Sequence, residues 1–331
     1  MGSKGEVMPN GTRPCFVSSS TIFLDTLGNP VWRWSACLSK IPHSIEGRSV
    51  KIHPTAVVSP EARLGSNVEI GPLCIVEPDA QIGDDCVLHG HVTIKSGTIL
   101  GNGNRVFESA ILGGLPQHVH MPERPGRVVI GNGNTIRENV TIHRALREDV
   151  DTIVGNNNLL MVNTHVAHDC VVGSNIIVTN NAMLGGHVHV EDRAYVSGGV
   201  AVHQFCRIGT LAMVGGQSHV VKDVPPYVTV DGLSSYVVGL NQVGLRRAGY
   251  TPEQISQLKT AYRVLYRNTL LWEELLSQLK AEFPEGPAAH FHEFCSQTKR
   301  GIVPERRMPP GATIKLRHEP EQEGLLRAKA G

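Results

Sequence analysis

The sequence predicts an all-β architecture, a parallel β-helix of hexapeptide repeats, followed by a C-terminal α-helical domain. Three observations support this prediction. Aliphatic residues recur every six positions through most of the chain, glycine often follows the aliphatic residue, and clear helix-start signals appear only after the repeat has ended. Aromatic residues make up only 5% of a chain with 35 glycines, which favours a tight, repetitive fold.

The repeat covers the region from Ile52 to Val220. A period of six fits neither the 3.6-residue period of an α-helix nor the two-residue alternation of a lone strand. Short strands that turn a corner every sixth residue explain it, and three of them close a triangular coil of about 18 residues, stacked about 4.8 Å from the next. The 26 aliphatic positions, all Ile, Leu or Val, are Ile52, Val58, Leu64, Ile70, Val76, Ile82, Leu88, Ile94, Leu100, Val106, Leu112, Ile130, Ile136, Ile142, Val154, Leu160, Val166, Val172, Val178, Leu184, Val190, Val196, Val202, Ile208, Val214 and Val220.

Small residues often occupy the fourth position after the aliphatic residue, where we expect them to fit beside the core. Cys74, Cys86, Cys170 and Cys206 lie in this slot, so we predict that they fill the core and are not reactive. The chain has seven cysteines and no CxxC pair, which argues against a disulfide framework and against a cysteine zinc site.

Two loops interrupt the repeat. The first, residues 113–129, contains GLPQHVHMPERPGR, and the second, residues 143–153, contains ALREDVDT. Long loops on a rigid scaffold often carry function. We therefore expect the first loop, rich in Pro, His and Arg, to contribute to a site, whereas the second is more simply explained as surface decoration.

The pattern changes after Val220. The two prolines of VKDVPPY cannot sit inside a strand ladder, so the β-helix is expected over residues 48–228. An N-cap at Thr251, a proline at the next position and a capping-box Gln254 begin a helix that extends to about Arg267.

The remaining segments complete the predicted domain organisation. Two further helices are expected over residues 272–283 and 288–299, within a helical domain of residues 229–302. Residues 303–331 have the composition of a flexible charged tail. Residues 1–47 show no periodicity and hold more basic than acidic residues, which indicates either a transit segment to the mitochondrial matrix or a disordered extension of a cytoplasmic protein.

The charge balance limits the classes of partner. Lys and Arg total 31 against 30 Asp and Glu, so nothing indicates a nucleic-acid partner or a broad anionic membrane surface. No apolar run approaches about 18 residues, and we expect no transmembrane segment.

Histidines give the first indication of a functional site. The chain has 16 of them, and nine lie between His118 and His219. Residues one coil apart should lie above one another on the prism, so sequence spacing can be converted into geometry. One edge is then expected to hold His143, His168, Gly186, His187, His203 and Gln204, with His165 three residues before His168.

Clustered histidines serve either as metal ligands or as general bases. A His-only zinc site, as in the γ class of carbonic anhydrases, is one interpretation of this edge, and a catalytically silent scaffold is another. Asp169, which directly follows His168, favours a base with its orienting carboxylate, and we expect no metal and no cofactor. A Ser or Cys nucleophile lacks support, because no GxSxG motif appears and Cys170 should face inward.

Four segments outside the plain repeat are similar to those of a known family. They are residues 163–170 (NTHVAHDC), 141–144 (TIHR), 201–206 (AVHQFC) and 223–227 (DVPPY). Together they resemble the UDP-N-acetylglucosamine O-acyltransferases, hexapeptide-repeat enzymes that open lipid A biosynthesis. The resemblance extends from about His53 to Gly301, and it implies a left-handed β-helix, although parallel crossovers are usually right-handed.

The resemblance also implies a reaction and a set of roles. A homotrimer would form active sites between neighbouring prisms and transfer a fatty, 3-hydroxy acyl group from the phosphopantetheine of acyl carrier protein to the 3-hydroxyl of UDP-N-acetylglucosamine. His168 would be the base, Asp169 its orienter and the Gly186 N–H the oxyanion donor. Substrate contacts would come from Gln117, His143, His165, His187, His203, Gln204, Asn241 and Arg247, and the acyl groove would pass Gly216 and Ser234.

The sequence departs from the family pattern in three places. His118 and His120 stand where bacterial members carry an acidic and a lysine side chain, which leaves the sugar contacts of the first loop open. Leu233 and Ser234 replace a histidine that often gauges acyl length, so acyl length is not implied. The basic run of Arg246 and Arg247 ends at an alanine.

The two extensions bear on localisation and on a rival function. Residues 1–47 and 303–331 exceed the compact bacterial form, which favours a eukaryotic version imported into an organelle, mitochondrion first and plastid second. The rival N-acyltransferases of the same pathway usually carry an N-terminal uridine-binding domain, which 47 unpatterned residues cannot supply.

Overall fold

The computed structural model describes residues 49–306, together with two short N-terminal strands, β1 (Phe23–Leu24) and β2 (Pro30–Val31), which pair antiparallel. The expected transit segment, residues 1–47, otherwise lies outside the described residues, as does the expected tail beyond residue 306. Within the described part of the chain, no helix is both long and apolar enough to cross a bilayer.

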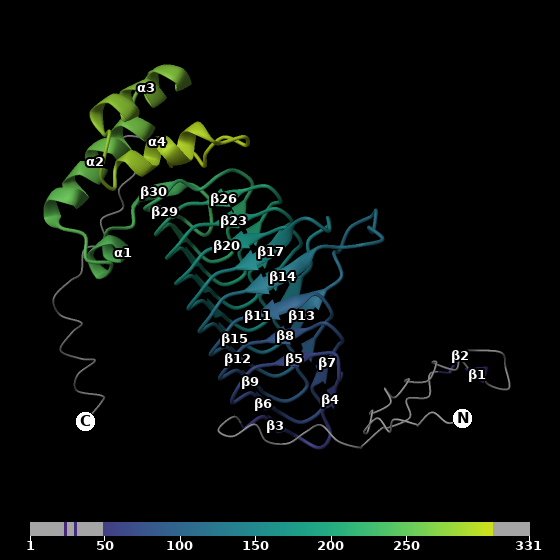
Figure 1. Ribbon diagram of the computed structural model, residues 1–331. Coiled ribbons are helices and arrows are strands. Elements are labelled where there is room, and N and C mark those ends of the chain that lie inside the picture. Colours follow the sequence, from purple (N-terminus) through teal and green to yellow (C-terminus); the bar gives the residue numbers. More distant parts are fainter. Residues whose placement is uncertain (1–22, 25–29, 32–48, 307–331) are drawn as a thin grey trace, which may run out of the picture. The chain divides into compact units, whose positions relative to one another are not determined.

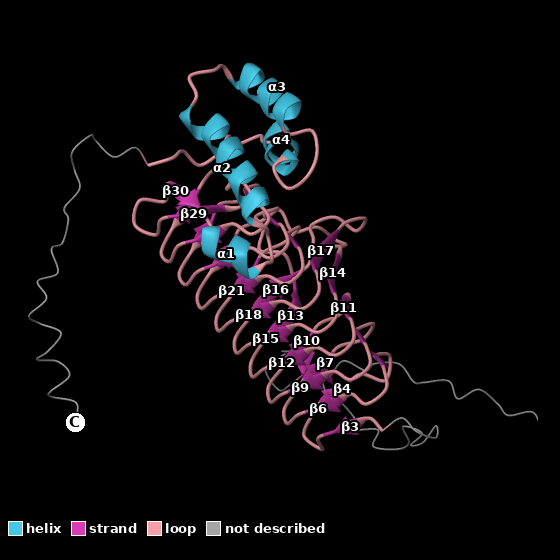
Figure 2. Ribbon diagram, turned by 90° about the vertical axis from the view of Figure 1, so that its left-hand side faces the viewer, coloured by secondary structure: helices cyan, strands magenta, loops and turns pink. Residues whose placement is uncertain are grey.

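Three parallel sheets form the faces of a prism, with the helices at its C-terminal end (Figures 1 and 2). Face 1 contains β3 (Lys51–Ile52), β6 (Glu69–Ile70), β9 (Val87–Leu88), β12 (Arg105–Val106), β15 (Thr135–Ile136), β18 (Leu159–Leu160), β21 (Ile177–Val178), β24 (Tyr195–Val196), β27 (Met213–Val214), β29 (Val228–Val230) and β30 (Val237–Leu240). Face 2 contains β4 (Val57–Val58), β7 (Ile75–Val76), β10 (Thr93–Ile94), β13 (Ile111–Gly114), β16 (Thr141–His143), β19 (His165–Val166), β22 (Met183–Leu184), β25 (Ala201–Val202) and β28 (His219–Val220). Face 3 contains β5 (Arg63–Leu64), β8 (Gln81–Ile82), β11 (Thr98–Leu100), β14 (Arg127–Ile130), β17 (Asp151–Val154), β20 (Val171–Val172), β23 (His189–Val190) and β26 (Arg207–Ile208).

The predicted left-handed parallel β-helix is confirmed. All repeat aliphatics from Ile70 to Val220 are buried, and the three before Ile70 are partly buried because they lie in the terminal coil. The loops leave the ladder intact, since Leu112 pairs with Ile142 across the first loop and Ile142 with Val166 across the second. The coils therefore keep their vertical register on either side of each loop.

The inward slot beside the aliphatic core holds cysteines and asparagines among other, mostly small residues. The four repeat cysteines are fully buried, as predicted, and Cys170 donates its S–H to the Gly185 carbonyl. Three successive coils place asparagines there instead, Asn104, Asn134 and Asn158, all at most 2% exposed. Each side-chain oxygen accepts a backbone N–H from the following coil, so the ladder leaves these buried amides paired.

The C-terminal part begins with an element the sequence did not reveal. β29 and β30 form an antiparallel hairpin that ends face 1, and α1 (Gln242–Arg247) follows it. The predicted capping box of α2 (Pro252–Arg267) is confirmed. The remaining two helices are shorter than expected, α3 (Trp272–Glu282) and α4 (Ala289–Ser296).

Residues 303–306 correct the expected start of the flexible tail. Val303 is 4% exposed, and its N–H donates to the Asp223 carbonyl. The hydroxyl of Tyr266 donates to the Val303 carbonyl, while that of Tyr262 donates to Glu305. Residues 303–306 are ordered against the protein because two buried tyrosines of α2 need hydrogen-bond acceptors. The charged composition of the segment could not predict this.

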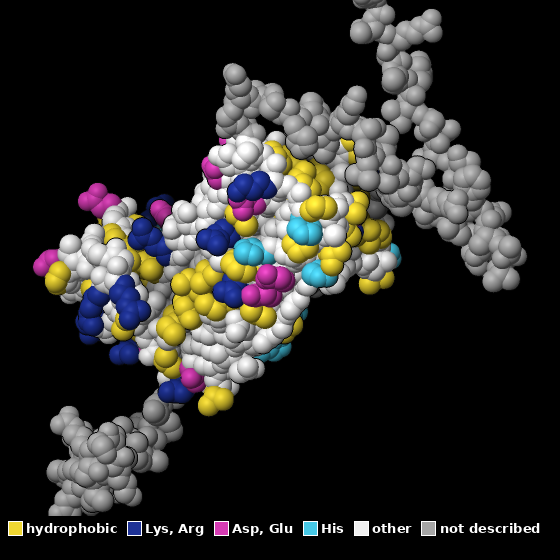
Figure 3. All heavy atoms as spheres, turned by 90° about the horizontal axis from the view of Figure 1, so that it is seen from below, with side chains coloured by type: hydrophobic (Ala, Val, Ile, Leu, Met, Phe, Trp, Pro, Cys, Tyr) yellow, Lys and Arg dark blue, Asp and Glu magenta, His cyan; other side chains and the backbone are white. Residues whose placement is uncertain are grey.

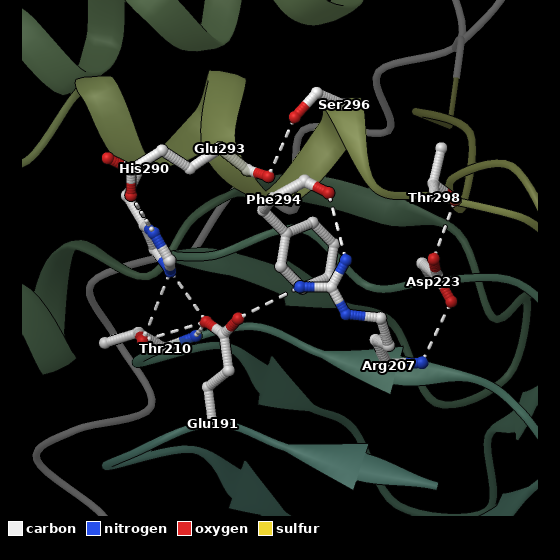
Figure 4. A network of polar contacts seen from close by, with 9 residues as sticks. All are labelled: Glu191, Arg207, Thr210, Asp223, His290, Glu293, Phe294, Ser296 and Thr298. Atoms are coloured by element: carbon white, nitrogen blue, oxygen red, sulfur yellow. Dashed lines mark hydrogen bonds and ion pairs between the residues drawn. The ribbon is translucent and has the colours of Figure 1, made fainter. Parts of the chain in front are cut away.

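A polar network joins α4 to the last coils of the prism (Figure 4). The Glu191 carboxylate accepts hydrogen bonds from His290 Nε2 at 2.7 Å and from the Thr210 N–H at 2.8 Å, and it pairs with Arg207. The Arg207 guanidinium lies 4.1 Å from the centre of the Phe294 ring and donates a hydrogen bond to the backbone carbonyl of Phe294. These contacts anchor the short α4, which lacks a side-chain cap of its own.

We expect the pair of Glu191 and His290 to make stability depend on pH. Burial disfavours both charges, but the hydrogen bond between them prevails, so the pKa of His290 is raised and that of Glu191 is lowered. The contribution of His290 is complete below its unfolded pKa of about 6.5 and lost as pH rises through the folded value. The contribution of Glu191 to folding stability is present above its unfolded pKa and is lost as pH falls through its lowered folded pKa.

The test is thermal unfolding of wild type and His290→Gln, followed by helical circular dichroism. The variant should lose about 1 kcal/mol, or about 2–4 °C in Tm, at about pH 5.5, and less at about pH 8.5. Thr269→Ala, a change at an exposed residue outside this network, should alter Tm equally at both pH values. A larger loss for His290→Gln at the higher pH would contradict the assigned ion pair.

Candidate active site

The candidate site lies on the edge between faces 2 and 3, where the chain turns from β19 to β20. Val166 points into the core, and the next residues turn the corner, which leaves His168 only 6% exposed. Asp169 has a φ of 59°, in the left-handed region that aspartate tolerates better than most residues. The repeat therefore fixes the backbone from which both side chains project.

The Asp169 carboxylate orients His168. Its Oδ2 lies 2.7 Å from His168 Nδ1 and also accepts the Leu146 N–H at 3.1 Å, while the Asp169 N–H donates to Thr152 Oγ1. A proton on Nδ1 is required for this hydrogen bond, so Nε2 carries the lone pair. Leu146 belongs to the second loop, which corrects the view of that loop as decoration, because it supplies a donor to the carboxylate.

Gly186 lies one coil above His168. A Cβ at this position would lie 2.5 Å from His168 Cε1, so the imidazole occupies the space that any side chain would need. The neighbouring His187 N–H donates to the His168 carbonyl at 3.0 Å. In contrast, no hydrogen bond within residues 49–306 uses the Gly186 N–H, which leaves it available to a ligand.

Three more of the predicted histidines lie near the pair of His168 and Asp169. The His187 ring lies edge-on to His168 at 5.3 Å, and the His143 and His165 rings are 5.1 Å apart. Burial lowers the pKa of His165, with a further contribution from the neighbouring imidazoles of His143 and His168. Burial also lowers the pKa of His187, against the opposing effect of Asp169. Both rings are therefore neutral near pH 7, where each has one donor and one acceptor nitrogen.

The first loop folds over the same edge. His143 Nδ1 lies 2.6 Å from the Leu115 carbonyl, which ties the start of the loop to the site. The ring of His118 reaches within 5.7 Å of His168, edge-on, and the His120 N–H donates to His118 Nδ1. The first loop thus contributes the His118 imidazole to the site, at a position for which the family resemblance leaves the sugar contacts open.

The other predicted residues lie farther out. His203, Gln204 and Gln117 are exposed, the first two on the coil above Gly186 and the third on the first loop. Asn241 caps α1, with its oxygen accepting the Gly244 N–H and its amide donating to the Leu211 carbonyl, so both ends are occupied. Arg247, at the end of α1, is exposed.

Gly216 and Ser234 lie near the C-terminal end of the prism. Gly216 follows β27 on the edge between faces 1 and 2, with the Gly198 carbonyl 3.3 Å from the place of a Cβ. Ser234 lies in the β29–β30 turn and donates its hydroxyl to Asp231. No contact among the described residues joins either of them to His168.

The same edge contains atoms that could hold a metal ion. One ligand atom each from His168, Asp169 and His187 lies within 4.8 Å of the others. However, Asp169 Oδ2 already accepts hydrogen bonds from His168 Nδ1 and from the Leu146 N–H, so this carboxylate oxygen has two partners without a metal. The arrangement fits an oriented base better than a ligand set.

Three contributors were missed from the sequence. Leu146 and Thr152 act on Asp169 through a backbone N–H and a buried hydroxyl. Phe205 stacks on His187. The coil spacing could have found Phe205, because it lies 18 positions after His187, whereas the loop contact has no comparable signal.

Known proteins share both the sequence and this fold. Residues 223–303 match the family described as UDP N-acetylglucosamine O-acyltransferase, domain 2. An acyl-[acyl-carrier-protein]–UDP-N-acetylglucosamine O-acyltransferase of Burkholderia lata is 44% identical over 259 residues, which is 76% of this chain and 99% of the relative. One from Gloeothece citriformis is 41% identical over 261 residues, 77% of this chain and 95% of the relative.

Solved structures agree with these relatives. The UDP-N-acetylglucosamine O-acyltransferase of Moraxella catarrhalis superposes with a TM-score of 0.74 at 40% identity, covering 76% of this chain and 99% of its own. The Arabidopsis UDP-N-acetylglucosamine acyltransferase does so with a TM-score of 0.69 at 33% identity, with the same coverage.

Proposed function

The chain belongs to the acyl-[acyl-carrier-protein]–UDP-N-acetylglucosamine O-acyltransferase family, and from this premise we propose how its own residues perform the reaction. It is an acyltransferase that transfers an acyl group from acyl carrier protein to UDP-N-acetylglucosamine, in lipid A biosynthesis. The acceptor we propose is the 3-hydroxyl of the glucosamine.

The observation that carries the mechanism is the buried pair of His168 and Asp169 beneath the free Gly186 N–H. His168 Nε2 removes the proton from the sugar hydroxyl as its oxygen attacks the thioester carbonyl carbon. The Gly186 N–H donates to the oxyanion of the tetrahedral intermediate. When the intermediate collapses, the C–S bond breaks and the leaving pantetheine thiolate takes from His168 the proton that the sugar hydroxyl gave up. Asp169 stabilises the imidazolium between these steps.

The surrounding groups bind the substrates. Neutral His165 and His187 can each donate and accept a hydrogen bond with sugar hydroxyls or the pantetheine arm, and His143 lies beside His165 at the same edge. His203, Gln204 and Gln117 are exposed at the same edge and extend this surface. The exposed Arg247 suits the diphosphate, since a guanidinium binds phosphate oxygens in a bidentate manner. Asn241 acts indirectly, because its side chain is used to cap the helix that ends at Arg247.

A direct assay tests this function. Purified protein is incubated with UDP-N-acetylglucosamine and 3-hydroxyacyl carrier proteins of several chain lengths, and the products are weighed by mass spectrometry. We expect an alkali-labile O-acyl product, unchanged in yield after treatment with EDTA. No acylated nucleotide sugar with any donor would overturn the proposed function, and acylation that needs added zinc would favour a zinc site formed by these histidines over the His168 base.

We propose that the active form is a homotrimer. Outward positions of face 2 hold Val57, Ile75, Ile111 and Met183, each at least 37% exposed in the single chain. Seen from below, hydrophobic side chains gather in patches on the surface, with histidines among them (Figure 3). An apolar sheet face of this kind supports burial against a second copy.

Light scattering at micromolar concentration should give three times the 35.9 kDa mass of one chain. Ile75→Asp places a charge on face 2 and should shift the mass toward a single chain, with loss of activity from the shared clefts. Ile153→Asp, at a similarly exposed position on face 3, is the matched control and should remain trimeric. A monomeric, fully active wild type would contradict the shared cleft.

The neighbourhood of Gly216 and Ser234 should set acyl length. Gly216→Met fills the space beside the Gly198 carbonyl and should move the donor preference toward shorter chains, by about fourfold in relative kcat/KM per methylene excluded. The KM for UDP-N-acetylglucosamine serves as the control and should not change. If Gly216→Met and Ser234→Leu both keep the wild-type preference, the groove lies elsewhere.

We propose that residues 1–47 direct the protein to the mitochondrial matrix, with a plastid as the alternative. The support is the length of chain before the first repeat and its slight basic excess. Import of the full chain into isolated organelles, compared with a chain that lacks residues 1–47, tests this. Equal import of both chains would overturn it.

A further inference from the structure

Phe205 lies on the site edge, one coil above His187. Its side chain is exposed, with 52% of the residue accessible, so it contributes little to the core. Instead its ring stacks on the His187 imidazole, with the two centroids 4.5 Å apart and the planes 9° from parallel. One flat side of the imidazole is therefore covered by the phenyl ring.

The backbone of Phe205 has a positive φ, which is uncommon for a large residue, although Leu73 and Tyr227 also adopt it in this chain. Its φ is 67°, in the left-handed region that corners of this prism mostly fill with glycine, asparagine or aspartate, such as Asn163 and Asp169. Bulky side chains are disfavoured there, and residues held in such conformations tend to cluster at functional sites. An exposed aromatic residue at this corner thus calls for an explanation other than packing.

The imidazole that Phe205 covers is next to the reacting groups. His187 Nε2 lies 3.9 Å from Asp169 Oδ2, and its ring is perpendicular, at 88°, to that of His168. We propose that Phe205 is a positioning residue: its ring fixes the plane of His187, so that His187 presents a nitrogen to the substrate beside the base. This inference rests on the function proposed above, because it assigns His187 a substrate contact.

The Phe205 backbone supports the same site. Its N–H donates to the Gly186 carbonyl at 3.0 Å, one residue before His187. This hydrogen bond orients the peptide between Gly186 and His187 and does not need the phenyl ring. A change of side chain therefore removes the stack and leaves the Gly186 backbone in place.

The prism contains a second pair of the same kind. His89 and Phe107 are also 18 positions apart and stack with centroids 4.3 Å apart and planes 14° from parallel. They lie on the edge between faces 1 and 2, away from His168. Phe107 thus offers a matched control, in which the same stack is removed from a different edge.

The experiment is a double-mutant cycle on kcat/KM for UDP-N-acetylglucosamine. Phe205→Leu is the chosen change, because Leu73 and Leu211 already occupy corners with φ of 57° and 55° in this chain. Phe205→Leu should lower kcat/KM by about 3- to 10-fold, the strength of one aromatic pair. Phe205→Tyr keeps the stack and should restore at least half of wild-type activity, while Phe107→Leu should leave activity unchanged.

The decisive value is the effect of Phe205→Leu in a His187→Ala background. If Phe205 acts through His187, the second change should lower kcat/KM by less than about twofold, since the two effects are then not additive. Full additivity, or an equal loss in Phe107→Leu, would overturn the inference. Failure of the proposed function is distinguishable, because the wild type itself would then form no O-acyl product.

Discussion

His168→Ala is expected to abolish turnover while UDP-N-acetylglucosamine binding survives within a few-fold. In the proposed mechanism the imidazole takes the proton of a hydroxyl whose own pKa is far above neutrality. General base catalysis contributes about 10²–10⁴-fold, so its removal should add at least about 3 kcal/mol to the barrier. In the proposed mechanism binding depends instead on separate groups, including Arg247 and Gln117, which the change leaves in place.

Two measurements check this division of roles. Turnover is followed by mass spectrometry, and nucleotide-sugar binding by calorimetry on the same preparations. Asp169→Asn is the graded comparison: it weakens the orientation of His168 but leaves the base, so its loss of kcat should be smaller. If His168→Ala keeps more than about a tenth of wild-type turnover, or if Asp169→Asn is the more damaging change, His165 or His187 becomes the candidate base.

The repeat explains why so much of this site could be predicted. Each coil adds one vertical step, so His168 and Gly186 had to meet once the prism was assumed. The two loops do not disturb this vertical alignment of coils, because the strands on either side of each loop keep their pairing. A period that survives interruption converts sequence distance directly into spatial distance, which an ordinary globular fold does not allow.

The features that escaped prediction lack such a period. The Leu146 N–H reaches Asp169 from a loop, and a backbone donor leaves no mark on the sequence. Residues 303–306 look charged and mobile, yet they satisfy tyrosines some forty residues earlier, as with Glu305 and Tyr262.

The helical part shows the limit of assigning residues by resemblance. The resemblance implies a substrate contact for Asn241, but its side chain caps α1 and donates to the Leu211 carbonyl. Its substitution would disturb the helix that ends in Arg247. Capping energetics and substrate affinity would then change together, so Arg247 is the cleaner position at which to measure phosphate recognition.

Gly186→Ala is the second change from which we expect a large effect, a fall in kcat of about 10²-fold. The added methyl would lie 2.5 Å from His168 Cε1 and 2.8 Å from Nε2, which is closer than real contacts allow. The ring cannot simply move aside, because it is buried and its Nδ1 is held by Asp169. Either the imidazole turns away from the carboxylate or the Gly186 peptide shifts, and a displacement of about 1 Å of a catalytic group can cost about 10²-fold.

Gly90→Ala is the matched control for this change. Gly90 occupies the same place in its hexapeptide, two residues after the buried aliphatic Leu88, but its added methyl would lie 3.5 Å from Pro72, an ordinary contact. It should keep nearly full kcat, and both variants should unfold within a few degrees of wild type. A Gly186→Ala enzyme with more than about a fifth of wild-type kcat would contradict the close contact between the oxyanion donor and the base. A large loss in both variants would instead locate the effect in the stacking of the coils.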